Sequence, residues 1–259
     1  MAVPGRKVPA SAPAGLADTE LFAVDAYRRD FDSPVIAVDP EQGRVALRRT
    51  AFYPGGGGQP HDTGVLRWAD GSASVSKVKR EGPLIWHWLE GEHLPDQDAE
   101  VYGELDWERR HLTMRTHTAL HILCGVIWAD HGVAVTGGNM DPGKGRLDFA
   151  FDAMSAEFGR RIETRINAEI AAAREVVVDF VGREVADADP DLIRVAAHLI
   201  PREIDPLRVI DIVGLDKQAD GGTHVLGTAE VGAVAVTGTE SRGKANKRIR
   251  LEVRDPGTA

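Results

Sequence analysis

The chain has 259 residues, of which 42% are hydrophobic and 27% charged, and its formal net charge is −9. These values are typical of a globular protein that can bury a core in one large domain or two small ones. The acidic balance argues against a protein that coats nucleic acid through charge alone, and we expect no DNA partner. No apolar run approaches the roughly 20 residues of a membrane span, so we expect no membrane partner.

The first 15 residues are rich in proline and alanine and lack the apolar stretch of a secretory signal, so residues 1–15 are predicted to be a disordered tail. Cys124 is the one cysteine, which excludes an internal disulfide and favours a reducing cytoplasm. A short lead-in follows the tail over residues 16–30. The hydrophobic period then changes near Asp106, which divides the chain into a domain over 16–106 and a second over 107–259.

The first domain is predicted to be a small β-barrel. Six short apolar runs recur at intervals of roughly 8–12 residues, the spacing of strands in a small closed barrel. An Asp70-Gly71 turn joins two of these runs and is the strongest hairpin signal in the chain. The predicted strands contain residues 35–38, 45–47, 65–68, 74–78, 84–89 and 99–105.

The second domain combines helices with strands. Apolar residues at helical spacing predict a helix that Asp106 caps and Gly132 ends. A second helix is predicted from Ser155 to Arg174, and a third, shorter one over 183–197. Strands are predicted over 146–149, 176–180, 208–213, 231–237 and 247–253. The expected fold class is α+β, with an N-terminal barrel followed by a domain whose helices pack on an antiparallel sheet.

Two motifs far apart in the chain have ligand spacing suited to one metal ion. His117 and His121 are four residues apart in a helical stretch, so both imidazoles lie on one face, one turn apart. Asp220 and His224 have the same spacing, but the two glycines between them favour a bend that folds both ligands toward one point. Three neutral imidazoles and one carboxylate suit zinc, and we predict one zinc ion per chain.

Each motif taken alone has a simpler interpretation. A histidine pair on an amphipathic helix is often two ordinary polar residues beside a core, and Asp-Gly-Gly-Thr-His can be a turn with a capping aspartate. A metalloprotease helix carries glutamate directly after its first histidine, where this chain has Thr118, so that class is excluded. Cys124 follows His121 by one turn, but a lone cysteine is more often a small buried hydrophobic residue.

Two glycine-rich segments and one basic segment have both structural and functional interpretations. The run over 55–60 is neither a phosphate-binding loop nor a dinucleotide-binding turn, and a flexible barrel loop is its simplest interpretation. Thr136-Gly137-Gly138-Asn139 is interpreted as a loop in which a ligand can approach the backbone closely, or as a plain turn. Residues 241–250 carry five cations and no acid, which indicates either a solvated face or a contact with phosphates.

These motifs, in this order, resemble the alanyl-tRNA editing proteins, free-standing relatives of the editing domain of alanyl-tRNA synthetase. The resemblance extends from about residue 16 to 253. It is carried by Thr50-Ala51-Phe52-Tyr53-Pro54-Gly55-Gly56-Gly57-Gly58-Gln59-Pro60 with Asp62-Thr63-Gly64, by Asp106-Trp107-Glu108-Arg109-Arg110 with Met114-Arg115-Thr116-His117-Thr118-Ala119-Leu120-His121, by Gln218-Ala219-Asp220-Gly221-Gly222-Thr223-His224-Val225, and by Gly243-Lys244-Ala245-Asn246-Lys247-Arg248-Ile249.

The resemblance implies that residues 107–259 form an editing domain and that the protein is a hydrolase acting in trans. Its substrate is expected to be alanine tRNA that carries serine, or glycine, on the acceptor end. Substrate binding is expected at Thr136, Gly137, Gly138, Asn139 and Gln59, and contacts with tRNA at Lys244, Lys247, Arg248 and Arg250. Thr118 and Thr223 are the hydroxyls nearest the predicted metal, and they either orient water or make local hydrogen bonds.

Two residues depart from the pattern of that family. The better-known pattern has cysteine where this chain has Asp220, and the synthetase domain usually has threonine where this chain has Leu120. A carboxylate keeps the ligand charge of a thiolate but is a harder ligand, so other divalent ions compete better with zinc. Two alternatives remain open at this stage: a tRNA-binding protein in which zinc is structural, and a metal-dependent hydrolase of small esters.

Overall fold

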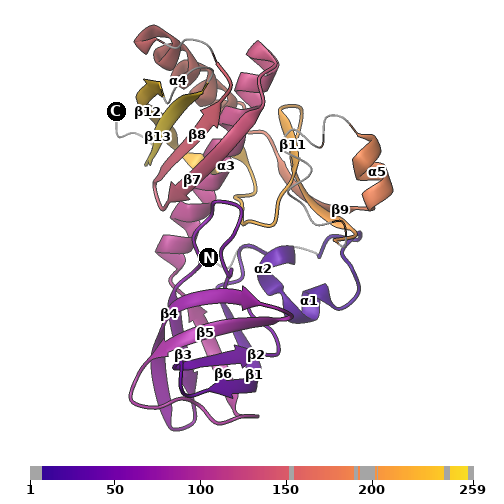
Figure 1. Ribbon diagram of the computed structural model, residues 1–259, viewed down its shortest axis with the longest axis vertical. Coiled ribbons are helices and arrows are strands. Elements are labelled where there is room, and N and C mark those ends of the chain that lie inside the picture. The colour runs from indigo at the N-terminus through magenta and orange to yellow at the C-terminus, as the bar shows by residue number, and fades with distance from the viewer. Residues whose placement is uncertain are drawn as a thin grey trace. The chain divides into compact units, whose positions relative to one another are not determined.

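The computed structural model describes residues 8–151, 155–189, 192, 202, 204–241 and 246–255, so residues 1–7 of the expected tail lie outside the described residues. The chain falls into two compact units. The first comprises the chain up to Gly56 together with 60–110, and the second comprises Gly57–Gln59 and the chain from His111 onward. Figure 1 labels the elements of each unit.

The first unit is the predicted barrel. Its strands form a closed antiparallel barrel in the order β1-β2-β5-β4-β3-β6, which confirms the sequence-based prediction (Figure 1). Two short helices precede it, α1 (Leu16–Thr19) and α2 (Leu21–Val24). The strands are β1 (Asp30–Asp39), β2 (Arg44–Leu47), β3 (Gly64–Trp68), β4 (Gly71–Glu81), β5 (Leu84–Glu90) and β6 (Glu100–Leu105).

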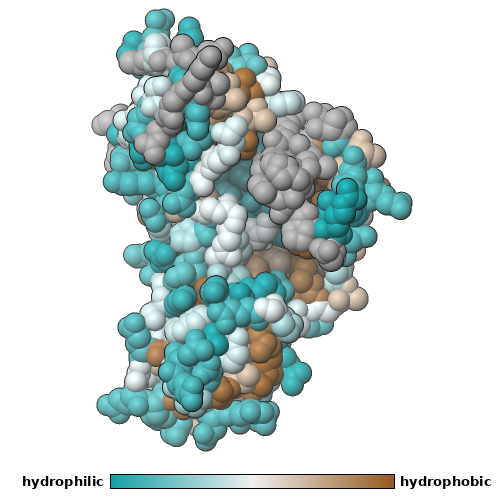
Figure 2. Space-filling view, in the orientation of Figure 1, coloured by the Kyte–Doolittle hydropathy of each residue, from teal (hydrophilic) through white to brown (hydrophobic). Residues whose placement is uncertain are grey.

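Alternating side chains fill the barrel interior, as in β6, where every second residue is buried. β1 begins at Asp30, five residues before the predicted apolar run. The sequence did not reveal this start, because Phe31 is the only apolar residue among residues 30–33. Phe31 pairs with Gly103 on β6, where an added Cβ would lie 2.6 Å from the Phe31 ring. That glycine therefore makes room for a buried aromatic ring. The face of the molecule drawn in Figure 2 is largely hydrophilic, with apolar patches.

The second unit contains two antiparallel sheets and the remaining helices. One sheet has the order β12-β13-β8-β7 and the other β11-β10-β9. The elements are α3 (Trp107–His131), β7 (Val135–Asp141), β8 (Lys144–Phe149), α4 (Ala156–Ala171), β9 (Val176–Val181), α5 (Arg183–Ala188), β10 (Leu207–Ile212), β11 (Asp216–Ala219), the 3-10 helix η2 (Thr228–Val231), β12 (Ala233–Ser241) and β13 (Lys247–Arg254). The expected third helix is present at its start, and most of 190–197 lies outside the described residues.

Both predicted ends of the long helix α3 are confirmed. Asp106 accepts the backbone N–H of Arg109 at 3.1 Å, as an N-cap does. Gly132 adopts a φ of 64° and donates its N–H to the carbonyl of Trp128, as in a helix C-cap. None of the helices in the described ranges has the length and apolar character needed to cross a bilayer.

The interpretation of Thr136–Asn139 as a loop or a turn is wrong. These residues lie in the edge strand β7, which pairs with β8. The ladder shifts register between Val135 and Gly137, so Thr136 is an extra, bulged residue. Glycine is needed at Gly138, where an added Cβ would lie 2.6 Å from Leu147, whereas Gly137 has no such close neighbour. Glycines that indicate a turn in the sequence therefore permit close packing within a strand.

Helix α4 covers β12, which confirms the expected packing of helix on antiparallel sheet. Its N-cap is Ser155, as predicted, because the side chain accepts the N–H of Phe158. Asn167 bonds to both the N–H and the carbonyl of Val234, at 3.0 and 2.7 Å. Ile166 is wholly buried on the same helix. Helix α4 is thereby fixed against the sheet at strand β12.

Candidate metal centre

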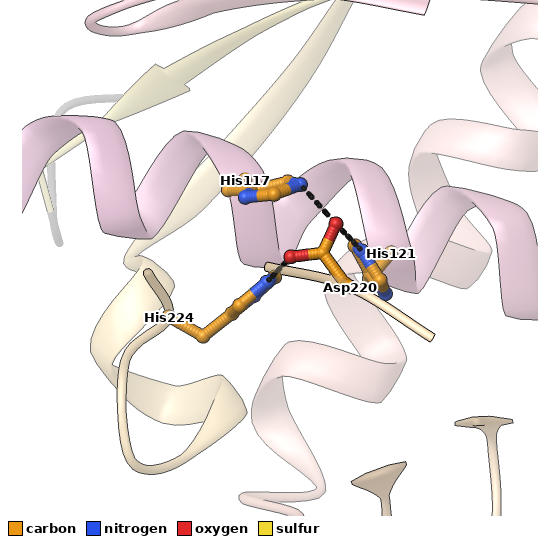
Figure 3. Close-up of side chains that lie close together, drawn as sticks. All are labelled: His117, His121, Asp220 and His224. Carbon is orange, nitrogen blue, oxygen red and sulfur yellow. Dashed lines mark hydrogen bonds and ion pairs between the residues drawn. The ribbon is translucent and has the colours of Figure 1, made fainter. Parts of the chain in front are cut away.

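Four side chains of the second unit converge on one point (Figure 3). His117 and His121 project from adjacent turns of α3, as their spacing predicts. Asp220 follows the end of β11, and His224 lies in the bend after it. One potential ligand atom from each of the four lies within 4.8 Å of the others. Within the described part of the chain, the two halves of the predicted site therefore meet.

The carboxylate of Asp220 lies among the three imidazoles (Figure 3). Its Oδ2 is 3.5 Å from Nε2 of His117 and 3.9 Å from Nε2 of His121, and its Oδ1 is 3.3 Å from Nε2 of His224. Ligands about 2.0–2.1 Å from a tetrahedral zinc ion are separated by about 3.4 Å. The carboxylate and imidazoles are therefore close to the spacing that a small divalent ion requires.

Each imidazole turns its Nδ1 away from this centre toward a different partner. His117 Nδ1 lies 2.9 Å from Oε1 of Gln59, and His121 Nδ1 lies 2.9 Å from Oδ2 of Asp216. His224 Nδ1 lies 3.2 Å from the hydroxyl of Thr118. Metal-binding histidines are usually held in this way, because a partner at one ring nitrogen fixes the tautomer that leaves the other free. This arrangement fits a metal ion, which the four residues would hold through three nitrogens and one oxygen.

The tautomer of His117 follows from the bonds of Gln59. The Gln59 Oε1 also accepts the backbone N–H of Thr223, while its Nε2 donates to the Thr223 hydroxyl, both at 3.0 Å. These two bonds fix the amide orientation, so Oε1 acts as an acceptor toward His117 and the proton must be on Nδ1. Gln59, which was predicted to bind substrate, therefore lies on the Nδ1 side of the His117 ring, whereas Asp220 lies on the Nε2 side.

Thr118 and Thr223 are both wholly buried. The hydroxyl of Thr118 contacts His224 and also accepts the N–H of Val225 at 3.3 Å. The hydroxyl of Thr223 accepts from Gln59. Both side chains are thus engaged in hydrogen bonds that brace the cluster.

Glycines allow the supporting elements to approach the histidines. A Cβ added at Gly222 would lie 2.5 Å from both Oε1 of Gln59 and the ring of His117, whereas a Cβ at Gly221 would meet nothing within 4 Å. On α3, a Cβ added at Gly125 would lie 3.1 Å from Cβ of Asp216. Only the smallest residue therefore fits at the two places where the bend and β11 pack against the long helix.

Burial and neighbouring charges set the protonation of the cluster. Burial lowers the pKa of His117 to about 4 and holds the pKa of His224 well below its usual range. Burial also opposes protonation of His121, but the carboxylates of Asp216 and Asp220 outweigh it and raise the His121 pKa to about 9. Although burial disfavours its charged form, the pKa of Asp220 lies well below its ordinary value because of the surrounding histidines. The carboxylate and two of the imidazoles thus carry free electron pairs.

A cavity of about 630 Å³ opens beside the cluster, and His117, His121 and Asp220 are part of its wall. The other lining residues are Gly57, Gly58, Leu120, Cys124, Val135, Thr136, Gly137, Gly138, Asn139, Met140, Leu147, Gln218 and Ala219. All four predicted residues of β7 therefore line this cavity, whereas Gln59 is not among the described residues that do so.

The glycine run that resembled a flexible barrel loop also forms part of this wall. Each of the glycines from Gly55 to Gly58 has a positive φ, a backbone conformation that other residues rarely adopt. The carbonyl of Gly58 accepts the N–H of Met140 on β7 at 3.2 Å. Consecutive glycines are therefore needed to bring this backbone against the edge strand and to carry Gln59 to His117.

The predicted tRNA-binding residues are less open than their sequence indicates. Arg248 makes a two-pronged ion pair with Asp148, at 2.7 and 2.8 Å, and Lys247 is buried. Arg250 pairs with Glu240 at 2.6 Å but keeps 42% of its side chain exposed. Lys244 lies outside the described residues. The acids that neutralise these arginines lie on neighbouring strands, where the composition of residues 241–250 could not reveal them.

Two buried residues of the site were missed by the sequence interpretation. Asp216 holds His121, and Gln218 lines the cavity and bonds to Asp216. Their alternation along one strand places both side chains on the same face as Asp220, a period-two pattern that could have identified them.

Comparisons with known proteins relate most of the chain to one family. Residues 21–109 match the family model of tRNA synthetases class II (A), and residues 207–250 match that of the threonyl and alanyl tRNA synthetase second additional domain. The chain is 35% identical over 237 residues to alanyl-tRNA editing protein AlaX-M of Saccharolobus solfataricus and 32% identical over 240 residues to that of Methanosarcina barkeri. Each match covers 91% of this chain and 98% of the relative.

A longer class of relative matches over a similar stretch. The chain is 38% identical over 227 residues to alanine–tRNA ligase of Pyrobaculum neutrophilum, but it spans only 25% of that protein. The matches to the editing proteins, which the chain covers almost completely, confirm the resemblance that the motifs indicated. The chain belongs to the alanyl-tRNA editing protein family.

Proposed function

We propose that this protein is an aminoacyl-tRNA deacylase that acts in trans on alanine tRNA and releases serine attached to it in error. The observation that carries the proposal is a cluster of four potential metal ligands, three of which line a cavity large enough to take a small molecule. The relatives named alanyl-tRNA editing proteins support the choice of substrate class. The reaction takes place in the cytoplasm, where tRNAs are charged.

In the proposed ester hydrolysis, one set of residues holds the ion and a second set orients the imidazole rings. When bound, a divalent ion supplies a Lewis acid that polarises the ester carbonyl and stabilises its developing negative charge. His117, His121, His224 and Asp220 would hold that ion beside the cavity. Gln59, Asp216 and Thr118 keep the three rings oriented, so the ligands need little rearrangement on binding.

Zinc is the proposed ion. Nitrogen-rich ligand sets with one carboxylate suit zinc, and the harder oxygen of Asp220 reduces the preference for zinc over other divalent ions. Asp220→Cys should therefore raise the affinity for zinc relative to manganese. A competition titration with both metals measures this ratio, and a ratio that does not rise in the cysteine variant would remove Asp220 from the ligand set.

The edge strand β7 is the proposed wall against the aminoacyl group. Gly137 has room for a side chain, so Gly137→Val should narrow the cavity without disturbing the fold. We expect slower deacylation with unchanged metal content. Gly138→Val is the contrasting variant, because its side chain would collide with Leu147 and should destabilise the sheet. Full deacylation by Gly137→Val would remove β7 from the substrate site.

The decisive experiment measures release of serine, glycine and alanine from the same alanine tRNA, with and without a chelator. We expect rapid release of serine, little release of alanine, and loss of activity on chelation that added zinc restores. Equal rates for serine and alanine would contradict a proofreading role. Binding of tRNA without release of any amino acid would identify a binding protein with a structural metal, and hydrolysis of small esters alone would identify a different hydrolase.

A further inference from the structure

The carboxylate of Asp216 holds two side chains at once. It lies at the start of β11, and its side chain is wholly buried. Oδ2 accepts from Nδ1 of His121 at 2.9 Å. The amide Nε2 of Gln218 donates to both carboxylate oxygens, at 3.0 and 2.8 Å. One buried anion therefore links a metal ligand to the side chain of Gln218.

This contact fixes which end of the Gln218 amide faces Asp216. Gln218 is 4% exposed and lines the 630 Å³ cavity. A carboxylate accepts hydrogen bonds only, so the NH₂ end of the amide must lie toward Asp216. The carbonyl oxygen is therefore the end of the amide that points away from Asp216. The same cavity wall includes the apolar side chains of Leu120, Val135 and Leu147.

We propose that Gln218 is a specificity-determining residue that accepts a hydrogen bond from the hydroxyl of a seryl group, and that Asp216 is the residue that positions it. This inference rests on the proposed function. An alanyl group has no hydroxyl to offer this oxygen. A buried acceptor left without a donor costs about 1–3 kcal/mol, which corresponds to roughly 5–150-fold in rate. The amide thus favours serine, because an alanyl group leaves the amide oxygen without a hydrogen-bond donor.

The test uses Gln218→Met, which keeps the length of the side chain and removes the amide. Lys217→Met is the matched control, because Lys217 lies between the two residues on β11 and its ion pair with Asp189 is partly exposed. We expect Gln218→Met to lower kcat/KM for serine release by about 10–100-fold, with a much smaller effect on the slow release of alanine. Zinc affinity, measured by competition with a chromophoric chelator, should remain unchanged.

Asp216→Asn separates the positioning role from the contact. It should lower zinc affinity by about 10–100-fold through His121, and it should lower serine release even when zinc is saturating, because Gln218 loses its anchor. Circular dichroism and thermal melting check that each variant is folded. Lys217→Met should match the wild-type protein in both affinity and rate.

Four outcomes would overturn the assignment. Wild-type selectivity in Gln218→Met would show that the amide makes no discriminating contact. An equal loss for serine and alanine would indicate a contact with a group common to both, such as the α-ammonium, and a loss of zinc affinity in this variant would place Gln218 among the metal supports. If the wild-type protein itself releases no serine, the proposed function fails, and this assignment fails with it.

Discussion

The barrel interior and the candidate metal centre both contain buried histidines, but the partners of their ring nitrogens differ. His87 in the barrel is wholly buried, with Nε2 2.9 Å from the hydroxyl of Thr50 and Nδ1 3.4 Å from the carbonyl of Val45. Both ring nitrogens thus meet neutral groups. In the metal centre each histidine has an outer partner at Nδ1 only, and the three Nε2 atoms surround the carboxylate of Asp220.

The difference shows which property of a buried histidine indicates function. Burial alone lowers the pKa of His87 to about 4 and keeps it neutral within a structural core. His117 is equally buried and has a similarly lowered pKa. What distinguishes His117 is the direction of its second nitrogen, which faces other potential ligands. Convergence of nitrogens therefore identifies the site, and neither burial nor a shifted pKa does so alone.

The largest expected effect comes from removing a ligand. His117→Ala and His224→Ala should each abolish stoichiometric metal binding, because three ligands remain around a site built for four. His87→Gln should retain one ion per chain, since its ring nitrogens serve the barrel. Elemental analysis after desalting measures all three variants. Full metal content in both alanine variants would overturn the ligand assignment.

A smaller loss is expected when the supports of the ligands are disturbed. Gly222→Ala places a methyl group against Gln59 and His117, so it should weaken zinc binding by about 10–100-fold, as loss of an outer partner does. Gly221→Ala, one residue away, meets open space and should bind zinc as the wild type does. Equal affinities in the two variants would show that the bend does not press on His117.

The barrel histidine predicts a pH dependence of stability. Its pKa is about 4 in the folded state and 6.5 in the unfolded chain, so only the unfolded chain binds the proton between these values. Its contribution is fully present above pH 6.5 and is lost as the pH falls toward 4, by about 3 kcal/mol at ~1.4 kcal/mol per pKa unit. Denaturant unfolding at several pH values, with zinc absent throughout, measures this slope.

His87→Gln is the comparison for that profile. The variant starts from a lower stability, but its free energy of unfolding should fall less steeply between pH 6.5 and 4. Because the metal-site histidines are the same in both proteins, the difference between the two slopes belongs to His87. Parallel profiles would mean that His87 is already protonated in the folded barrel.

Local periodicity predicted the elements of this fold, and contacts across the sheets decided the rest. The alternation in β6 and the caps of α3 are local features, so the barrel and the long helix could be predicted. Gly138 could not be interpreted correctly because its role depends on Leu147, the neighbour on β8 that needs the space. Glycine gives the same local signal in a turn and in a closely packed strand.

The four-residue cluster was predictable because two motifs with equal spacing each supply two of its potential ligands. Their supports were harder to assign. Gln59 is 58 residues from His117 in the chain, and its bond to that ring arises from the path of the glycine run. Asp216 is an ordinary acidic residue in sequence and acquires its role only where β11 packs on α3 at Gly125. Long-range packing therefore determines which polar residues serve the site.

The smallest expected effect concerns the basic strand β13, where two arginines provide a matched pair. Arg250 keeps 42% of its side chain exposed, whereas Arg248 is held by Asp148 with 10% exposed. If this strand contacts tRNA phosphates, Arg250→Gln should reduce the slope of log affinity against log salt by roughly 0.7–0.9, the value for one contact. Arg248→Gln should change that slope less, because the Arg248 side chain is only 10% exposed. Titrations of tRNA at several salt concentrations measure both, and unchanged slopes in both variants would make the strand a solvated face with no part in binding.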